Sequence, residues 1–218
     1  MSERLRDERL TPQLLLRAYA AGVFPMADSA EAEEILWIDP ELRGVIPLDR
    51  FHAPKKLMRR VRRGDYEVTV DTDFEGVVDG CRGRSSTWIN GEIRKLYIAL
   101  HRMGFAHSIE TRHHGLLVGG LYGVRLGAAF FGESMFSHAT DASKVALVHL
   151  VARLRYGGFQ LLDTQFVTDH LVQFGAEAVT RARYREMLSE ALREEADFDA
   201  LDPATPGQEV AQLSAQRS

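Results

Sequence analysis

Apolar and polar positions follow no regular period before about residue 65 and a clear one after it. The first helix is well marked: Thr11 can cap its N-terminus, Pro12 suits its first turn and Gly22 follows as a stop. The prolines at Pro40 and Pro47 exclude a long helix in the segment that follows. We therefore expect residues 1–65 to form a small, loop-rich N-terminal subdomain.

Residues 66–200 show the periods of strands and helices. Helices are predicted over 73–81, 91–103, 142–156 and 182–195, with a further short helix that starts after Thr168 and ends at Gly175. Strands are predicted over 66–70, 106–112, 115–124, 127–131 and 159–165. Glycine-containing turns join the three strands between 106 and 131, which indicates an antiparallel meander. The pattern predicts an α+β domain over 66–200 and, from its small and polar residues, a frayed tail over 201–218.

The composition is that of a folded globular protein, since 45% of the 218 residues are hydrophobic. No apolar run of about 18 residues is present, and the first ten residues are too charged for a signal peptide. We expect a soluble, cytoplasmic protein. The single cysteine, Cys81, excludes an intramolecular disulfide and a cysteine-based zinc site, and no HExxH motif occurs, so neither a metal nor a cofactor is expected.

The net charge of −4 argues against nucleic-acid binding, but the charges are unevenly distributed. Six cations lie within nine residues: Lys55, Lys56, Arg59, Arg60, Arg62 and Arg63. One interpretation is a solvated helix face whose apolar residues, Leu57, Met58 and Val61, turn inward. The other is a patch that contacts phosphates. The pattern alone leaves both open.

Two carboxylates stand in otherwise apolar segments, Glu133 in FFGESMFS (130–137) and Asp163 in LLDTQ (161–165). Burying an unpaired carboxylate is costly, so each needs a partner or a function. We expect Glu133 in a turn at the end of the strand that contains Phe130, where it could face a cleft. A structural carboxylate that accepts hydrogen bonds from Ser134 and Ser137 is the alternative.

Asp163 and Gln165 are two residues apart on a predicted strand and should project to the same side. The carbonyl oxygen of a carboxamide can accept a hydrogen bond from an attacking amine, and a neighbouring carboxylate can orient the amide. The pair therefore fits amine attack on an acyl carbon. A strand end whose polar groups satisfy loop backbone is the competing interpretation.

Apolar and aromatic residues near Glu133, Asp163 and Gln165 could form a binding pocket, but their pattern fits an ordinary core equally well. Leu121, Phe130, Met135 and Phe136 could line a pocket or simply form core. Trp37 and Trp88 lie beside turn-forming or polar residues, where a ring could stack on a base or could pack in the interior.

Several blocks occur in order along the chain, among them AYAAGVFPM (18–26), LWIDPELRG (36–44), LHRMGFAHSIE (100–110), LVGGLYGV (117–124), FFGESMFS and LLDTQFVTDHLVQFGA (161–176). Over about residues 12–185 this series of blocks resembles the leucyl/phenylalanyl-tRNA-protein transferase family. It implies a GNAT-like acyltransferase fold after the N-terminal subdomain. It also implies an enzyme that moves leucine or phenylalanine from aminoacyl-tRNA to proteins with an N-terminal arginine or lysine, marking them for the N-degron route. Because one methylene changes binding by only about 1 to 3 kcal/mol, we expect weak use of methionine as well.

The resemblance also implies roles for individual residues. Asp163 and Gln165 match the pair implicated in peptide-bond formation, Glu133 the acid of the active site, and Trp37 and Trp88 tryptophans near the aminoacyl-adenosine. The substrate-binding positions that it implies are Leu121, Phe130, Gly132, Ser134 and Met135. The basic run becomes the candidate contact for the tRNA backbone. The chain departs from many members at Met26, Thr111 and Arg112, which puts its exact substrate preference in question.

Two other functions fit parts of the pattern. An N-acyltransferase that uses acyl-CoA would need a pyrophosphate-binding turn before a helix, and FSHATDASK is a poor one. A tRNA-binding module without catalysis would leave the two carboxylates unexplained.

Overall fold

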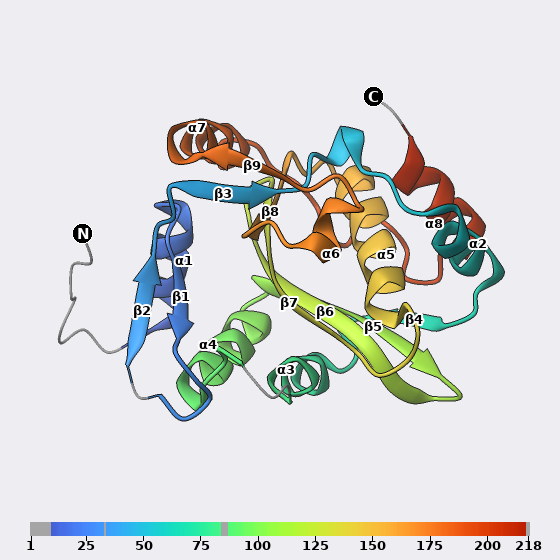
Figure 1. Ribbon diagram of the computed structural model, residues 1–218, viewed down its shortest axis with the longest axis horizontal. Helices are drawn as coiled ribbons and strands as arrows, with labels where there is room; N and C mark the ends of the chain where they lie inside the picture. The colour runs from blue at the N-terminus through green and yellow to red at the C-terminus, as the bar shows by residue number, and fades with distance from the viewer. Residues whose placement is uncertain (1–9, 33, 84–86, 217–218) are drawn as a thin grey trace.

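The computed structural model describes residues 10–32, 34–83 and 87–216, and Figure 1 shows a small N-terminal piece beside a larger mixed sheet covered by helices. The N-terminal piece consists of helix α1 (Pro12–Ala20) and the paired strands β1 (Phe24–Ala27) and β2 (Ile35–Ile38). Helix α1 begins as predicted, because the Thr11 hydroxyl accepts a hydrogen bond from the Leu14 amide at 3.1 Å. The charged segment of residues 1–9 lies outside the described residues.

The larger sheet has seven strands in the order β4, β5, β6, β7, β8, β3, β9. Their bounds are β3 (Leu42–Val45), β4 (Glu67–Val70), β5 (Ala106–His113), β6 (Leu116–Leu126), β7 (Ala129–Ser137), β8 (Leu161–Gln165) and β9 (Glu177–Thr180). The antiparallel meander is confirmed in β5, β6 and β7, whereas β7 and β8 pair in parallel. Helix α5 (Ala142–Tyr156) makes the crossover that this parallel pair requires.

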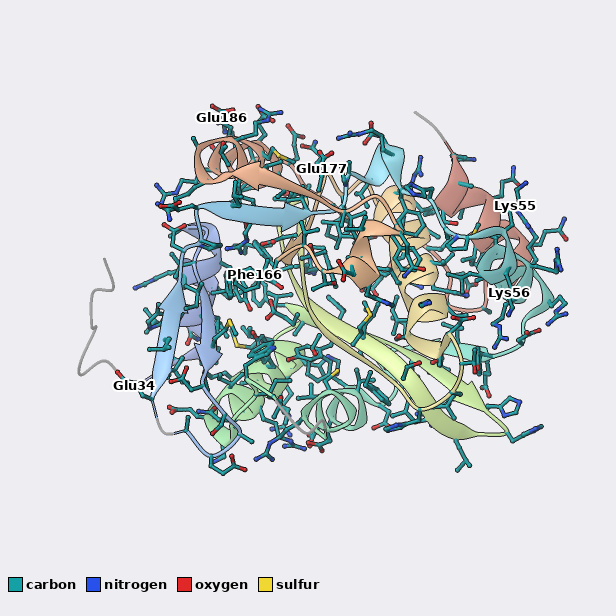
Figure 2. All side chains as sticks on the ribbon, in the orientation of Figure 1. Glu34, Lys55, Lys56, Phe166, Glu177 and Glu186 are labelled. Carbon is teal, nitrogen blue, oxygen red and sulfur yellow. The ribbon has the colours of Figure 1, made fainter. Side chains whose placement is uncertain are left out.

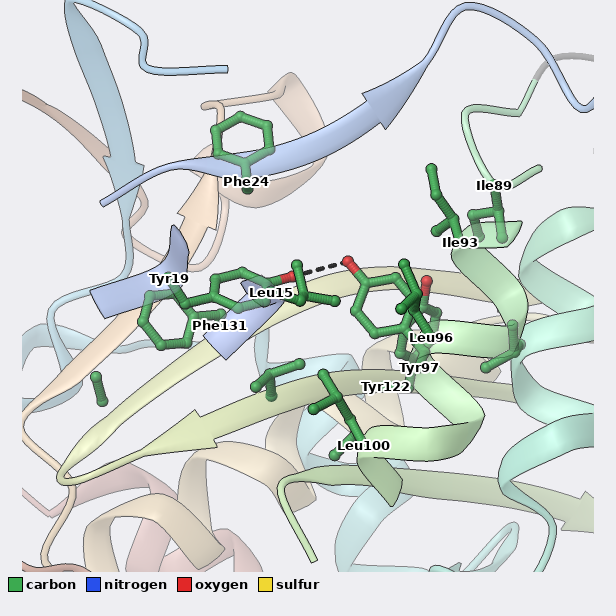
Figure 3. Close-up of a cluster of buried hydrophobic side chains, with 14 of the residues drawn as sticks. Leu15, Tyr19, Phe24, Ile89, Ile93, Leu96, Tyr97, Leu100, Tyr122 and Phe131 are labelled. Carbon is green, nitrogen blue, oxygen red and sulfur yellow. Dashed lines mark hydrogen bonds between the residues drawn. The ribbon is translucent and has the colours of Figure 1, made fainter. Parts of the chain in front are cut away.

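Helices cover both faces of the sheet, which gives the α+β architecture predicted from the sequence. Helices α3 (Phe74–Arg82) and α4 (Gly91–Arg102) lie on one face, and α5, α2 (Lys55–Arg63) and α8 (Gly207–Ala215) lie on the other (Figure 1). The core on the first face also takes in α1, and Figure 3 shows Leu15, Tyr19 and Phe131 packed beside residues of α4. The remaining elements are the 3-10 turn η1 (Leu48–Arg50), α6 (Asp169–Val172) and α7 (Arg181–Ala191).

Residues 42–63 pack with the larger sheet and its helices, although the sequence places them in the N-terminal subdomain. Strand β3 lies between β8 and β9, and α2 contributes Leu57, Met58 and Val61 to the core shared with α5. At Gly44 a β-carbon would meet the backbone of Phe166 at 2.5 Å, so only glycine allows this approach. Local periodicity cannot reveal a pairing between segments that lie more than 100 residues apart.

The C-terminal segment differs from the frayed tail predicted over 201–218, because residues 207–215 form helix α8. Val210 and Ala211 are buried in the same core as α2 and α5, and Arg155 Nη1 donates to the Ser214 carbonyl at 3.1 Å. Packing of two small apolar residues stabilises a helix that composition alone does not predict. Residues 217–218 lie outside the described part of the chain.

Two predicted helices are shorter than expected: α6 covers only Asp169–Val172, and α7 ends at Ala191. Within the described ranges, none of the helices combines the length and apolar character that a bilayer span would require.

Candidate active site

Glu133 lies inside β7 at a β-bulge, and the prediction that it follows the strand in a turn is wrong. Strand β7 continues past Glu133 to Ser137. On the neighbouring strand β6, Tyr122 pairs with Ser134 and Gly123 pairs with Gly132, so Glu133 is the extra residue between two consecutive pairs. A bulge interrupts the regular alternation and redirects the side chain of the extra residue. Local alternation gives no sign of this interruption, because Glu133 lies between Gly132 and Ser134 with apolar pairs beyond them.

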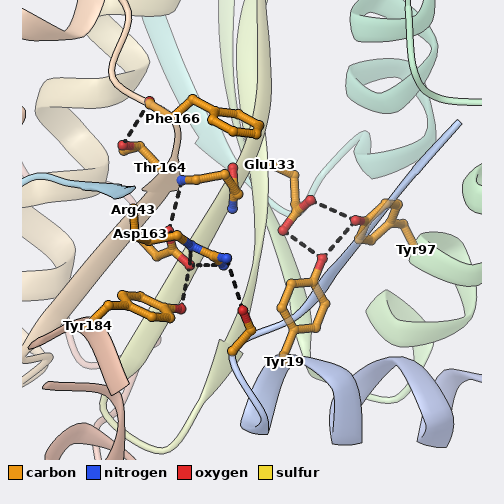
Figure 4. A network of polar contacts seen from close by, with 10 residues as sticks. Tyr19, Arg43, Tyr97, Glu133, Asp163, Thr164, Phe166 and Tyr184 are labelled. Carbon is orange, nitrogen blue, oxygen red and sulfur yellow. Dashed lines mark hydrogen bonds and ion pairs between the residues drawn. The ribbon is translucent and has the colours of Figure 1, made fainter. Parts of the chain in front are cut away.

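Two buried tyrosines hold the Glu133 carboxyl group (Figure 4). The Tyr19 hydroxyl lies 2.6 Å from Glu133 Oε1, and the Tyr97 hydroxyl lies 2.6 Å from Oε2. The two hydroxyls are also 2.7 Å apart. Burial raises the pKa of Glu133 to about 7, and the hydrogen bonds that the tyrosines donate to the charged form oppose that rise without cancelling it.

Asp163 is fully buried and forms an ion pair with Arg43. Arg43 donates from Nε to Oδ1 at 2.9 Å and from Nη2 to Oδ2 at 2.6 Å, and the Tyr184 hydroxyl donates to Oδ2 at 2.7 Å. The remaining nitrogen, Nη1, donates to the Gly22 carbonyl at 3.0 Å. Burial alone would lower the pKa of Arg43, but the Asp163 carboxylate raises it above its usual value. The charge of Asp163 is therefore balanced by Arg43.

Gln165 follows Asp163 on β8 in an unusual backbone conformation. Its φ is +57°, in the left-handed region that non-glycine residues seldom adopt. The backbone N–H of Gln165 donates to Asp163 Oδ1 at 2.8 Å. The carboxylate that is paired with Arg43 therefore also stabilises the left-handed backbone of Gln165. The side chain is 7% exposed, and its Nε2 atom has no hydrogen-bond partner among the described residues.

A cavity of about 620 Å³ brings many of the predicted residues together. The predicted positions that line it are Trp88, Leu121, Gly132, Glu133, Ser134, Met135, Phe136 and Gln165. Phe24, Met26 and Phe166 line it as well, so its wall is mainly apolar with a few polar groups, as in ligand sites generally. Asp163 does not reach the cavity surface. The prediction that Asp163 and Gln165 face the same side therefore needs correction, because the left-handed backbone of Gln165 interrupts the alternation of the strand.

Phe130 and Trp37 lie elsewhere. Phe130 is fully buried in the core on the α5 side, where it stacks on Phe198 with ring centroids 5.6 Å apart. Trp37 is half-buried in β2 and packs against the core that contains α1 and α4. Trp88, in contrast, lines the cavity and packs edge to face against Tyr97, with ring centroids 6.3 Å apart.

The basic run forms α2, and its apolar face is buried as one of the two sequence interpretations predicted. Arg60 Nη1 donates to the Thr140 carbonyl at 2.8 Å, and Arg63 forms an ion pair with Asp65 at 2.7 Å. Lys55, Lys56, Arg59 and Arg62 are exposed, and the two lysines lie at the outer edge of the molecule (Figure 2). Through its hydrogen bond to Thr140, Arg60 contacts the loop that follows β7, and Ser137 and His138, which precede Thr140, line the cavity.

Sequence reasoning missed the partners of both carboxylates, namely Tyr19, Arg43, Tyr97 and Tyr184. Arg43 and Asp163 are 120 residues apart, a separation that no local pattern can bridge. The one available signal was that Tyr19 and Arg43 lie within the blocks AYAAGVFPM and LWIDPELRG. Across the described ranges, no three His, Cys, Asp or Glu side chains are grouped as a metal site would need.

Comparison with known proteins adds a family to this geometry. Residues 45–189 match the family described as leucyl/phenylalanyl-tRNA protein transferase, and residues 8–41 match its N-terminal domain. A protein of that name from Nitrobacter winogradskyi is 55% identical over 100% of both chains, and one from Rhodopseudomonas palustris is 59% identical over 90% of both. One from Paramagnetospirillum magneticum is 58% identical over 87% of this chain and 93% of its own.

A solved structure titled "The structure of L-PGS from Bacillus licheniformis" aligns with 73% of this chain and 55% of its own. Its TM-score of 0.39 and identity of 16% are too low to assign the fold.

Proposed function

This chain belongs to the leucyl/phenylalanyl-tRNA-protein transferase family, and we propose that it transfers leucine or phenylalanine to proteins that begin with arginine or lysine. As a member of the family it is an aminoacyltransferase that takes its donor from tRNA and its acceptor from protein. The proposal further includes weak use of methionine, a role in N-degron degradation and a location in the cytoplasm. It also retains the GNAT-like fold, for which an antiparallel meander next to a parallel strand pair is the supporting feature.

The observation that carries this proposal is Gln165, whose amide nitrogen has no partner among the described residues and whose side chain lines the cavity. The Gln165 carbonyl oxygen can accept a hydrogen bond from the acceptor amine, and its N–H group can donate to the oxyanion that forms at the ester carbonyl. The aminoacyl ester is already activated. The protein therefore has to hold the amine and the ester in contact, and positioning supplies much of the catalysis.

Asp163 acts in this scheme as a positioning residue. Its Oδ1 atom holds the backbone of Gln165 in the left-handed conformation, and Arg43 and Tyr184 fix the carboxylate in turn. Because Arg43 balances its charge, Asp163 does not supply a free negative potential for a cationic acceptor. Replacing Asp163 would also leave Arg43 buried without a counterion, so Gln165 is the cleaner residue to test.

The donor side chain is assigned to the apolar wall of the cavity. Leu121, Met135 and Phe136 lie there, with Leu147 and Leu150 from α5. The thioether of Met135 can adapt to more than one side-chain shape. Since one methylene changes binding by only about 1 to 3 kcal/mol, such a wall accepts leucine, phenylalanine and, less well, methionine. Trp88 is assigned to the terminal adenosine, on which its ring can stack. For Trp37 that contact rests on the family resemblance alone.

The transfer reaction is tested with radiolabelled leucyl-tRNA and a peptide that begins with arginine. We expect the wild-type protein to label the peptide, and Gln165→Ala to reduce the rate by about 100- to 1,000-fold, as loss of one oxyanion donor does elsewhere. Gln160→Ala is the matched control, because Gln160 is exposed just before β8 and does not line the cavity. Peptides that begin with lysine and alanine test the acceptor preference.

Two results would contradict this assignment. If the wild-type protein leaves the peptide unlabelled, the proposed reaction is wrong, and labelling from leucyl-CoA alone would identify an acyl-CoA enzyme. If Gln165→Ala and Gln160→Ala both transfer at the wild-type rate, the reaction stands and the role of Gln165 is wrong.

The exposed face of α2 is assigned to the tRNA backbone. Exchange of Lys55, Lys56, Arg59 and Arg62 for glutamine spares Arg60 and Arg63, which have protein partners. The affinity for tRNA should fall, and its dependence on salt concentration should become less steep by about 0.7 to 0.9 for each phosphate that the variant no longer neutralises. The control replaces two other exposed arginines with glutamine, Arg183 in α7 and Arg193 just after it. An unchanged salt dependence would mean that the exposed face of α2 is only a solvated helix face and does not contact phosphates.

A further inference from the structure

Tyr19, Tyr97 and Glu133 form a closed ring of hydrogen-bond contacts. The three contacts measure 2.6, 2.6 and 2.7 Å and connect each group to the other two. Figures 3 and 4 show the tyrosines approaching from α1 and α4, so the ring joins the N-terminal piece to the sheet. Each short O···O contact needs one hydrogen between its two oxygens.

Counting protons determines the state of the carboxyl group. Three contacts require three protons, and two tyrosine hydroxyls supply two of them. If Glu133 were ionised, both hydroxyls would donate to it, and the two phenolic oxygens would then face each other at 2.7 Å with no proton between them. If Glu133 is a neutral acid, its own proton completes the ring: Tyr19 donates to Oε1, Tyr97 donates to Tyr19, and the carboxyl group donates to Tyr97.

We propose that Glu133 rests as a neutral acid held by Tyr19 and Tyr97, and that it gives its proton to the tRNA oxygen that leaves during transfer. This inference rests on the proposed function for its substrate, whereas the protonation of Glu133 can be observed without any substrate. Tyr19 and Tyr97 are positioning residues, since both are fully buried behind the carboxyl group. Glu133 is the one carboxylate among the described residues that line the cavity, so it alone in the ring can pass a proton to a ligand.

The surroundings of Glu133 favour its neutral form. Burial is the largest cause of its raised pKa, and the nearby charge of Asp163 on β8 acts in the same direction. Arg43 on β3 and the hydrogen bonds from Tyr19 and Tyr97 act in the opposite direction. Tyr122 on β6 lies beside Tyr97, with ring centroids 5.1 Å apart, and burial keeps the pKa values of Tyr19 and Tyr97 well above their usual range. The ring therefore contains one labile proton.

The transfer step is balanced with this proton. The acceptor enters the step as a neutral amine, and its nitrogen forms a bond to the ester carbonyl carbon to give a tetrahedral intermediate. As the carbon–oxygen bond breaks, Glu133 protonates the departing ribose oxygen, which leaves as a hydroxyl of the tRNA. The new amide nitrogen then gives its excess proton to the Glu133 carboxylate, and the ring closes again.

The protonation state is tested by infrared spectroscopy on the full chain with no tRNA or peptide present. The wild-type protein at pH 6 should show the C=O band of a protonated carboxylic acid, and this band should be absent from Glu133→Gln. The difference between the two should diminish as the pH is raised through about 7. If no band depends on Glu133 at pH 6, the carboxyl group is ionised and the inference is wrong.

The catalytic part is tested with Glu133→Gln, because glutamine can donate one N–H and accept at its carbonyl, which preserves the ring but removes the acidic proton. We expect kcat to fall by about 100-fold or more, the range of general acid catalysis, with little change in KM for leucyl-tRNA and, at pH 4.5, little change in the melting temperature. The wild-type rate should decline on the alkaline side of its pH profile, and the variant should lose that decline. His138 and His170 also line the cavity, and any pH dependence of the rate that arises from them should persist in the variant.

The outcomes separate this inference from the proposed function. If the wild-type protein transfers leucine and Glu133→Gln transfers it equally fast with the same pH profile, the acid role is wrong and the transferase assignment stands. If the wild-type protein transfers nothing, the assignment fails, and with it the role of Glu133 as donor to tRNA. The infrared result still decides whether the ring holds a proton.

Discussion

The two carboxylates behind the cavity solve the same physical problem in different ways. Asp163 on β8 is buried with a cation, because Arg43 and Tyr184 together donate to its oxygens at 2.6 to 3.1 Å. Glu133 on the neighbouring strand β7 is buried with two tyrosines, and burial raises its pKa to about 7. One acid is kept charged by a counterion, and the other is held near the point where it gains or loses a proton.

This difference assigns different work to the two groups. An ion pair with both partners buried is costly to disturb, which suits Asp163 to holding the strained backbone of Gln165. A carboxyl group with a pKa near neutrality can exchange a proton during each turnover, which suits Glu133 to acid–base chemistry. Three experiments test this difference between Asp163 and Glu133. They remove the counterion Arg43, titrate Glu133, or delete one tyrosine hydroxyl from each cluster.

Removing the counterion should have the largest effect. Arg43→Met leaves Asp163 buried without a cation, and we expect the free energy of unfolding to fall by about 3 to 5 kcal/mol. Chemical denaturation at pH 7 measures it. The double variant Arg43→Met with Asp163→Asn removes both charges and should recover part of the loss. If Arg43→Met alone lies within about 1 kcal/mol of the wild type, below the range for breaking a buried ion pair, Asp163 does not depend on its counterion.

The sequence predicted the elements of the larger domain well, because their signals are local. The meander over β5 to β7 follows from alternating residues and glycine turns, and α5 from its apolar period and the glycine after it. Strands β3 and β9 were missed because each has four residues and belongs to the sheet only through pairing with distant segments. Helix α8 was missed because its stability comes from packing.

The candidate site was predicted in its residue types and not in its geometry. Polar residues in apolar surroundings singled out Glu133, Asp163 and Gln165 without any knowledge of their contacts. The bulge at Glu133 and the left-handed backbone at Gln165 break the period of two. Alternation therefore gave the wrong direction for Gln165 relative to Asp163, and the expected turn at Glu133 is a bulge inside the strand, although Glu133 does line the cavity. Phe130 shows the same limit, since this apolar residue, two positions from Gly132 in the cavity wall, is fully buried in the core and does not line the cavity.

Titrating the second acid should give the next largest effect. The usual pKa of a glutamate is 4.5 and that of folded Glu133 is about 7, so the folded state binds the extra proton between these values. The stabilisation that this group contributes is complete below the lower value and is lost as the pH rises through the higher one, a change of about 3 kcal/mol. The difference in unfolding free energy between the wild type and Glu133→Gln, measured from pH 4.5 to pH 8, isolates this term. A difference that does not vary with pH would show that Glu133 is ionised throughout.

Deleting one hydroxyl from each cluster makes the smallest and most closely matched change. Tyr184→Phe removes one donor to the charged Asp163, and Tyr97→Phe removes two neutral contacts of the ring, one with Glu133 and one with Tyr19. A hydrogen bond to a charged group contributes about 1.5 to 3 kcal/mol and a neutral one about 0.5 to 1.5 kcal/mol, so the two variants should lose a similar amount of stability at pH 6.

Raising the pH to 8 should change the loss in Tyr97→Phe and leave the loss in Tyr184→Phe unchanged, because Glu133 is then mostly ionised and Tyr97 donates to a charged carboxylate. Denaturation of both variants at the two pH values measures the effect, and the wild type at each pH provides the reference. A loss in Tyr97→Phe that is the same at both pH values would mean that Glu133 carries the same charge at both. Both clusters are buried to nearly the same extent, so burial alone does not distinguish them. The distinction between the ion-paired Asp163 and a proton-exchanging Glu133 would then fail.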